Sequence, residues 1–423
     1  MISINPDGLV GSILAVEGMN DATIILNGPG GCRNYHSFLS GIYNPRPESR
    51  DSVDRSEYFF FGQHRVPCTY LDEEDYIHGS VEKVEDILPI VIEKRNAMIV
   101  IINSPGASLI GDDLDGIIKR GDHSDKALVI EEATLSTAAS QGYDYAIKSM
   151  IDWLNPQEIK KEPNSINLLG ISIYDNDWKH AKEDLQHLLN LMGFTVLSTP
   201  GAGCTVEELR NSAKAEFNVI VRPEYAIDTA RLYEEKYNIP SIICNYGAPI
   251  GFEATKEWIS TISAKTGADP SRAFEFVEKY QRKAVSLLRE FQNHTTLPKG
   301  TTFGIRADSS IALALSKWLI DYLGMAPVAI DISPGEYVPH LNSLKMLLNN
   351  NGFSDVLLKS LNVERPDIVF ADGHTAMMME RAGACHIGVN ISPPSLERFN
   401  FIPRPIFGPQ GSMYLLDEII NGF

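Results

Sequence analysis

Short apolar runs alternate along the chain with longer segments whose apolar residues recur at the helical period. The apolar runs predict strands, which we expect at residues 22–26, 98–102, 166–171, 194–197, 218–221, 241–243, 302–305, 328–332, 367–370 and 386–389. Most of them are followed by a turn of Gly, Ser, Pro or Asp and then by an amphipathic segment. This alternation is typical of parallel, doubly wound sheets, and nine or more strands are too many for one such sheet. We therefore predict an α/β protein with about three Rossmann-like units.

Helix signals and polar stretches divide the chain. Helices are predicted at residues 181–192, after a capping box at residues 205–208, and at residues 270–292. Polar stretches at residues 155–164 and 293–300 predict two boundaries. The predicted domains are therefore residues 1–160, 161–296 and 297–423.

Length, composition and charge limit the class of protein. The chain has 423 residues, 43% of them hydrophobic and 22% charged, as in a globular protein of two or three domains. A net charge of −18 argues against a nucleic-acid or anionic-membrane partner. No apolar run is long enough to span a bilayer, and residues 1–7 lack the features of a signal peptide. Five cysteines, an odd number, do not suggest a disulfide framework. We expect a cytoplasmic protein with free or metal-bound cysteines.

The first candidate for chemistry is the stretch Gly28-Pro29-Gly30-Gly31-Cys32, which follows the apolar run 22–26. Its Gly and Pro content predicts a turn that continues neither a strand nor a helix. A cysteine at the carboxyl end of a buried strand, where backbone amides approach closely, can hold a sulfur-bound metal centre. His36 could donate a hydrogen bond to such a centre or simply pack. The alternative for Cys32 is a free buried cysteine beside a tight turn.

Other sequence features exclude some kinds of site but do not identify the reaction. Cys68 lies 36 residues after Cys32, and no CxxC pair exists, so the spacing is not that of a zinc ribbon. The loop at residues 103–113 contains glycines but no Gly-Lys-Ser/Thr ending. No Walker motif, GxSxG or HExxH occurs in the chain. This argues against a hydrolase or kinase with its own ATP site.

Three of these segments, taken together, resemble the nitrogenase component 1 superfamily. They are Gly28–Cys32, then Cys68-Thr69 with Asp72-Glu73, and then Ile110-Gly111-Asp112-Asp113. The resemblance continues in the same order through residues 203–209, 247–251, 365–369 and 408–412. It implies an α/β fold of three Rossmann-like, doubly wound parallel-sheet domains around a central cleft. The C-terminus would pack back on the first domain.

The resemblance also implies a set of cluster ligands. Cys32 and Cys68 match two of the three cysteines that hold iron–sulfur clusters in this family, and Gly28, Gly30 and Gly31 would shape the cluster pocket. The place of the third cysteine is taken here by Ser104-Pro105. Proline cannot ligate, and a serine oxygen is a poor substitute for a thiolate. Two chains would still supply four thiolates, as a [4Fe–4S] cluster shared between subunits needs. Ser104, Asp72 or a partner chain could instead replace the missing ligand.

Other cysteines and histidines have two interpretations each. Cys204, in the turn at residues 200–204, could bind a cofactor in the cleft or be a packed small residue. His374 follows a predicted strand and could be a proton donor or ligand, or else a capping or surface residue. Cys244 and Cys385 adjoin apolar strands and are expected in the core.

The function implied by the resemblance is that of a subunit in a nitrogenase-like two-component reductase. A separate ATP-hydrolysing iron–sulfur reductase would supply electrons, and the bridging cluster would relay them to a substrate or metallocofactor in the cleft. The chain would form a homodimer, or a heterodimer with a related subunit. The alternatives are a scaffold of the same fold for metallocofactor assembly and a cluster-free binding or structural subunit.

Overall fold

The computed structural model describes residues 6–44, 66–93, 97–130, 137–157, 159–392 and 400–423. Its strands form three sheets. The first has the order β1 (Ala22–Asn27), β2 (Met98–Asn103), β3 (Ala127–Ile130); the second β5 (Thr195–Ser198), β4 (Ser165–Leu169), β6 (Phe217–Ile220), β7 (Ser241–Ile243); the third β11 (Ile387–Ser392), β10 (Ile368–Asp372), β8 (Thr302–Ala307), β9 (Ala326–Ile332). Neighbouring strands pair in parallel throughout. The predicted α/β class with three parallel sheets is confirmed.

The described residues group into two compact units. One lies within residues 6–158 and 200–211 and contains the first sheet; the other lies within residues 159–199 and 212–423 and contains the second and third sheets. We call them the N-terminal unit and the C-terminal unit. The domain boundaries predicted near residues 160 and 296, and the central cleft, stay predictions.

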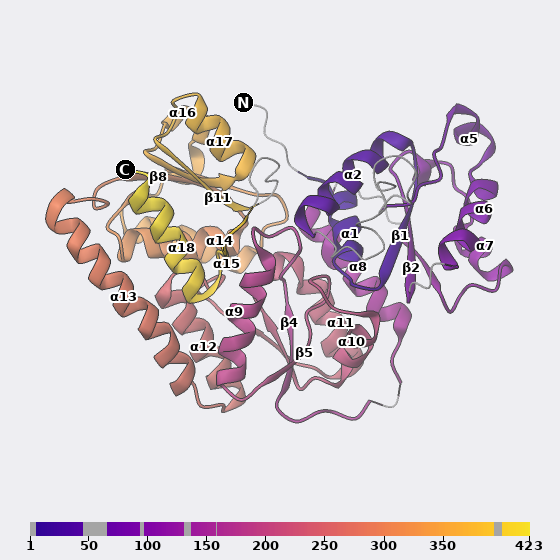
Figure 1. The fold of residues 1–423 in the computed structure, drawn as a ribbon, viewed down its shortest axis with the longest axis horizontal. Helices are drawn as coiled ribbons and strands as arrows, with labels where there is room; N and C mark the ends of the chain where they lie inside the picture. The colour runs from indigo at the N-terminus through magenta and orange to yellow at the C-terminus, as the bar shows by residue number, and fades with distance from the viewer. Residues whose placement is uncertain (1–5, 45–65, 94–96, 131–136, 158, 393–399) are drawn as a thin grey trace. The chain divides into compact units, whose positions relative to one another are not determined.

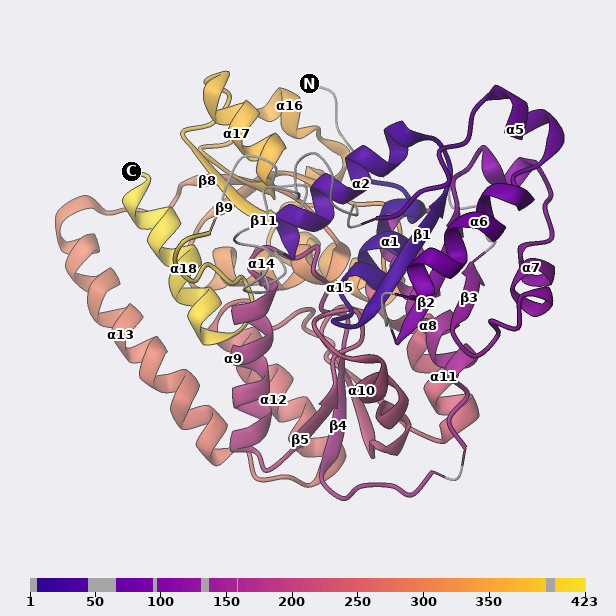
Figure 2. The ribbon, with the colours of Figure 1, turned by 45° about the vertical axis from the view of Figure 1, so that its right-hand side comes forward.

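The N-terminal unit is a sheet covered on both faces. Its helices are α1 (Gly8–Glu17), α2 (Gly30–Tyr43), α5 (Glu73–His78), α6 (Val81–Ile92), α7 (Leu114–Arg120), α8 (Ala139–Leu154) and α10 (Val206–Asn211), with a 3-10 turn η1 (Ala107–Leu109). On one face, Ile25 and Ile101 of the sheet pack with Leu88 of α6 and Ile117 of α7. Helices α6 and α7 lie on that side of β1 and β2, and α1 lies on the other (Figure 1 and Figure 2). Parallel strands buried on both faces read as unbroken apolar runs, which is why β1 and β2 were predictable.

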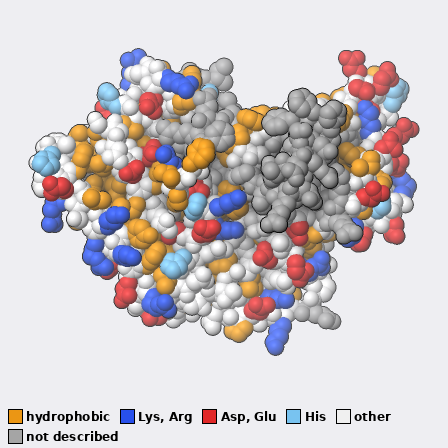
Figure 3. Space-filling model, in the orientation of Figure 1, with side chains coloured by type: hydrophobic (Ala, Val, Ile, Leu, Met, Phe, Trp, Pro, Cys, Tyr) orange, Lys and Arg blue, Asp and Glu red, His pale blue; other side chains and the backbone are white. Residues whose placement is uncertain are grey.

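The C-terminal unit surrounds its two sheets with longer helices. These are α9 (Trp178–Leu191), α11 (Ile227–Tyr237), α12 (Phe252–Thr266), α13 (Ser271–Thr295), α14 (Ser309–Asp321), α15 (Val338–Asn350), α16 (Leu361–Glu364), α17 (Gly373–Arg381) and α18 (Gly408–Asn421), with 3-10 turns η2 (Ser212–Lys214), η3 (Pro223–Tyr225) and η4 (Val356–Leu358). Helix α13 packs against α9, α12 and α18. A groove of about 250 Å³, lined mainly by apolar side chains such as Leu287 and Met413, runs between α13 and α18 (Figure 3).

The structure confirms two predicted helices and one predicted capping box. The helices expected at residues 181–192 and 270–292 are α9 and α13. The capping box before α10 is present, because Thr205 N donates to the Glu208 carboxylate at 2.7 Å and Glu208 N donates to Thr205 Oγ1 at 3.1 Å. Strand β3 was not predicted. Among the described residues, no helix is long and apolar enough to cross a membrane.

A buried ion cluster ties the second sheet to the third inside the C-terminal unit. Arg222 follows β6, is 1% exposed, and pairs with Asp175 at 2.6 Å and with Asp308, which precedes α14, at 3.0 Å. Its guanidinium also lies 3.9 Å from the centre of the Tyr225 ring. Burial raises the pKa of Asp175, and it raises the pKa of Asp308 to about 7 against the opposing charge of Arg222. These carboxylates therefore depend on Arg222 to stay charged inside the protein.

We predict that Arg222→Met destabilises the protein by on the order of 3–5 kcal/mol at pH 8, because it leaves buried carboxylates without a cation. Both carboxyls already have raised pKa values, so lowering the pH from 8 to 5 protonates them in the variant and reduces the loss. Denaturant unfolding at the two pH values measures this.

The matched control is Arg231→Met, which removes a surface pair with Asp228 and costs at most about 1 kcal/mol. A loss for Arg222→Met that equals the control, or that does not change with pH, would contradict the role given to the cluster.

Candidate functional site

Three loops of the N-terminal unit converge at the carboxyl end of its sheet. Strands β1 and β2 end side by side, with Asn27 opposite Asn103. The loop that carries Cys68 lies along β1, since Leu26 N donates to Pro67 O at 2.8 Å and Thr69 N donates to Leu26 O at 3.2 Å. The third loop begins after β2, where Ser104 N donates to Asn27 O at 2.8 Å. The structure thus brings together the three segments on which the family resemblance rests.

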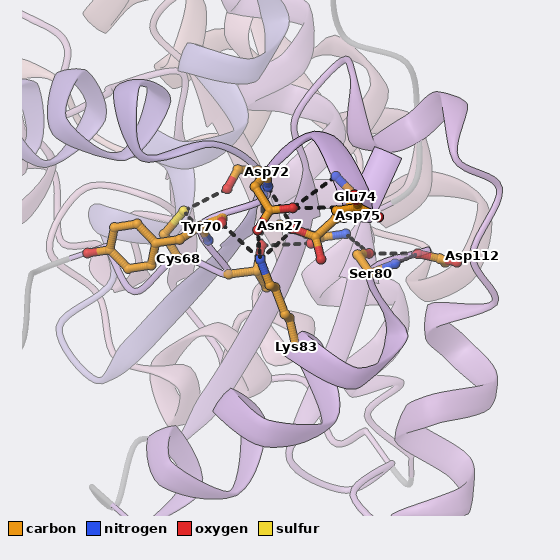
Figure 4. Close-up of polar contacts among 11 residues, drawn as sticks. Asn27, Cys68, Tyr70, Asp72, Glu74, Asp75, Ser80, Lys83 and Asp112 are labelled. Carbon is orange, nitrogen blue, oxygen red and sulfur yellow. Dashed lines mark hydrogen bonds and ion pairs between the residues drawn. The ribbon is translucent and has the colours of Figure 1, made fainter. Parts of the chain in front are cut away.

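Asn27 is the centre of the hydrogen bonds that hold these loops. Its amide nitrogen donates to Asn103 Oδ1 at 2.8 Å and to Ser80 Oγ at 2.9 Å, and its Oδ1 accepts from Thr69 Oγ1 at 2.8 Å. Ser80 in turn donates to Asp112 Oδ2 through N and Oγ, each at 2.6 Å. Figure 4 shows the chain of contacts from Asn27 through Ser80 to Asp112. The Gly-Asp-Asp motif therefore supports the site through Ser80, a role that the sequence did not indicate.

Gly28 allows the first and third loops to touch. A Cβ at this position would lie 2.7 Å from both Cβ and Oγ of Ser104, closer than real side chains approach. A Cβ at Gly30 would lie 3.2 Å from the Tyr70 ring, whereas one at Gly31 would meet nothing within 4 Å. Gly28 is therefore required by close packing, and Gly31 is not.

Cys68 is buried at the centre of this arrangement. Its thiol donates to Gly28 O at 3.0 Å, and its sulfur accepts from Tyr70 N at 3.3 Å. Burial raises the pKa of the Cys68 thiol; the Tyr70 N–H and the positive charge of Arg33 lower it, and a charge on Cys32 raises it. The Cys68 sulfur also lies 3.8 Å from the carbonyl oxygen of Pro29, the N-cap of the helix whose first turn carries Cys32.

Cys32 lies in the first turn of a helix, which corrects the predicted turn. Helix α2 begins at Gly30, with Pro29 as its N-cap in an extended conformation. Glycine costs a helix most in its interior, through lost backbone freedom, and Gly30 and Gly31 stand at the very start of α2. The first N–H groups of a helix have no partner within it, and together with the helix dipole they favour negative charge nearby. Burial, followed by the charge of Asp7, raises the pKa of Cys32.

The other predicted residues lie in different surroundings. His36 on α2 is buried, and burial lowers its pKa to about 4, so its ring is neutral at neutral pH. Cys204 is buried with its sulfur 3.2 Å from the Met19 sulfur, inside the N-terminal unit. His374 lies in the first turn of α17 after β10, in the C-terminal unit, and is partly exposed. Their roles as cluster, cofactor or proton-donor residues stay predictions.

Two oxygen ligands were left open by the sequence. Asp72 caps α5 by accepting from Glu74 N at 3.0 Å and pairs with Lys83 at 3.1 Å. The hydrogen bond from Lys83 lowers the pKa of Asp72 most. Ser104 is buried and accepts a 3.4 Å hydrogen bond from Ala107 N. The Asp72 carboxylate thus already has partners on α5 and α6.

The chain matches the family described as nitrogenase component 1 type oxidoreductase over residues 8–423. It is 24% identical to a subunit of the light-independent protochlorophyllide reductase of Synechococcus sp. over 85% of this chain and 73% of the relative. It is 22% identical to the nitrogenase molybdenum-iron protein beta chain of Methanococcus maripaludis, over 97% of this chain and 92% of the relative. It is also 22% identical to the nitrogenase iron-molybdenum cofactor biosynthesis protein NifE of Clostridium pasteurianum, over 77% of this chain and 68% of the relative. The fold is similar to that of a solved structure, "Nitrogenase Cp1 at pH 6.5", with a TM-score of 0.77 and 17% identity. The match covers 100% of this chain and 93% of the solved chain.

We predict that Gly28→Ala destabilises the N-terminal unit by about 1–3 kcal/mol, because the added methyl group collides with Ser104. Gly31→Ala is the matched control and should leave stability unchanged or slightly raised, since its methyl group meets open space. Urea unfolding of both variants measures the difference.

Ser104→Gly in the Gly28→Ala background should recover most of the loss by removing the side chain that collides. Equal stability of Gly28→Ala and Gly31→Ala, or no recovery in the double variant, would show that the contact between the two loops is not tight.

Proposed function

Because the chain belongs to the nitrogenase component 1 type oxidoreductases, we propose that it is a subunit of a two-component reductase whose iron–sulfur cluster is shared between two chains. The observation that carries the proposal is that Cys68 packs against Gly28 and Pro29, at the amino end of the helix whose first turn carries Cys32. The place of a third cysteine is held by Ser104, packed against Gly28. One chain therefore offers two thiolates.

The number of ligands favours a shared cluster over one bound by a single chain. In the described parts of the chain, no group of three or more His, Cys, Asp or Glu residues is arranged to hold a metal ion. A [4Fe–4S] cluster takes four cysteine thiolates, and two chains related by a two-fold axis supply four. The residues present fit such a cluster in two further respects. The N–H groups of the first turn of α2 have no helical partner, and Arg33 beside Cys32 carries buried donors without an acceptor among the described residues.

The chain's own residues would hold and tune the cluster. Cys32 and Cys68 would be the ligands, the Tyr70 N–H already donates to the Cys68 sulfur, and the Asn27 hydrogen bonds would fix the loops. N–H groups that point at ligand sulfur stabilise negative charge on it. When bound, such a cluster supplies one-electron transfer. His374 in the C-terminal unit is proposed as a proton donor and, separately, Cys204 in the N-terminal unit as a cofactor ligand.

Exposed apolar side chains around the site support a partner chain. Phe38 on α2, Tyr70 beside Cys68 and Leu109 on η1 are 56%, 49% and 88% exposed. Apolar side chains gathered around a functional site often mark an interface. We propose a homodimer, or a heterodimer with a related subunit. Because the sequence contains no Walker motif, we assign ATP hydrolysis to a separate iron-protein reductase.

The similarity to NifE, a cofactor biosynthesis protein, supports a second candidate. A scaffold for metallocofactor assembly would use the same two cysteines but would release a cofactor instead of reducing a substrate. Anaerobic protein that transfers a bound metallocofactor to an acceptor protein, and does not oxidise a reduced iron-protein partner, would favour the scaffold.

We predict that anaerobically purified protein contains about two iron and two sulfide atoms per chain, half of one [4Fe–4S] cluster. Cys32→Ala and Cys68→Ala should each lose most of both, because each removes half of the thiolates. Iron and sulfide analysis on the same preparations measures this.

Cys385→Ala is the matched control, since Cys385 packs in an apolar cluster of the C-terminal unit, and its iron content should equal that of the wild type. Wild-type iron content in Cys32→Ala would disprove the ligand assignment.

A further inference from the structure

The guanidinium of Arg33 is buried, and two of its three nitrogen atoms lack a hydrogen-bond acceptor among the described residues. Arg33 is 8% exposed, and among the described residues its Nε and Nη1 atoms have no hydrogen-bond partner; Nη2 donates to Asn34 Oδ1. Burial of a charged group that lacks hydrogen bonds is strongly unfavourable unless an opposite charge compensates it. The described part of the chain does not supply that compensation.

The position of Arg33 points to what the missing partner is. Arg33 follows Cys32 on α2, and its guanidinium lies 5.3 Å from the centre of the Tyr70 ring. The Tyr70 N–H donates to the Cys68 sulfur. The same sulfur lies 3.8 Å from the carbonyl oxygen of Pro29, the N-cap of the helix that carries Arg33. The free donors of Arg33 therefore belong to the same site as both cysteines.

We propose that Arg33 is a positioning residue for an anionic, thiolate-bound metal–sulfur cluster at Cys32 and Cys68, and that its Nε and Nη1 donors compensate the cluster's negative charge. This inference rests on the proposed function. Arginine suits the task because its charge is permanent and its donors are arranged in a rigid fork. Groups around a metal site that do not ligate it commonly tune affinity and potential.

The proposal predicts opposite effects in the metal-free and the loaded protein. Without metal, Arg33 is an uncompensated buried charge, so its removal should stabilise the chain. With the cluster bound, removal should weaken cluster retention and shift the reduction potential to more negative values, because the more negative reduced form loses a nearby cation. If Arg33 only supported packing, its removal would destabilise both the metal-free and the loaded protein.

The test compares Arg33→Met with wild type, Arg33→Lys and Arg120→Met as full-length protein. Methionine keeps an unbranched apolar side chain without charge. Arg120 is a surface residue of the same unit, paired with Glu85, and serves as the control. Three quantities are measured: the urea midpoint of the chelator-treated, metal-free protein, the rate of iron loss to a chelator, and the midpoint potential from an anaerobic redox titration.

We expect Arg33→Met to raise the urea midpoint of the metal-free protein, to lose iron about tenfold faster than wild type, and to have a more negative potential. Arg33→Lys should keep a potential near that of the wild type, because it keeps the charge. Arg120→Met should match the wild type in all three.

Each contrary outcome is distinct. Wild-type protein without iron or sulfide would overturn the proposed function itself. A loaded wild type whose iron-loss rate and potential are unchanged in Arg33→Met would overturn only the role of Arg33. A lower urea midpoint together with faster iron loss would make Arg33 a packing residue.

Discussion

The close contact between Gly28 and Ser104 is the constraint on which the candidate site depends. It brings the loop after β1 against the loop after β2 with no space for a side chain at residue 28. Asn27, one residue earlier, then joins both loops to the segment that carries Cys68 and Ser80. Parallel neighbouring strands deliver these loops to one edge of the sheet, and the hydrogen bonds of Asn27 fix their separation. The position of Cys68 relative to Cys32 follows from this packing.

The electrostatics of the site suit a bound anion better than a pair of free thiols. Burial raises the pKa of both cysteines, which opposes thiolate formation in the metal-free chain. The amino end of α2, the Tyr70 N–H and the donors of Arg33 that lack partners among the described residues all favour negative charge at the same place. Metal binding would stabilise the two thiolates despite their burial, and the negative charge would give the surrounding N–H donors an acceptor. With Ser104 where a third thiolate would stand, a single chain remains short of ligands.

Much of the fold could be predicted from the sequence, because strands buried on both faces of a parallel sheet appear as unbroken apolar runs. Strand β3 was missed because it is a four-residue edge strand with two partly exposed positions. The start of α2 was missed because glycine disfavours a helix, although this cost is largest in the helix interior and Gly30 and Gly31 stand at its first two positions. The two cysteines were found through the family pattern. The supporting role of Asn27, and the role we propose for Arg33, were not predictable, because they depend on loops that are distant in sequence and meet only in the folded chain.

Native mass spectrometry of the anaerobically purified protein tests the shared cluster most directly, because it reports the number of chains and the bound iron and sulfide in one species. A shared cluster predicts a species of two chains that carries one [4Fe–4S] cluster and separates into metal-free single chains when the cluster is removed. A single chain that carries a complete cluster, or a dimer in which each chain holds its own, would contradict it.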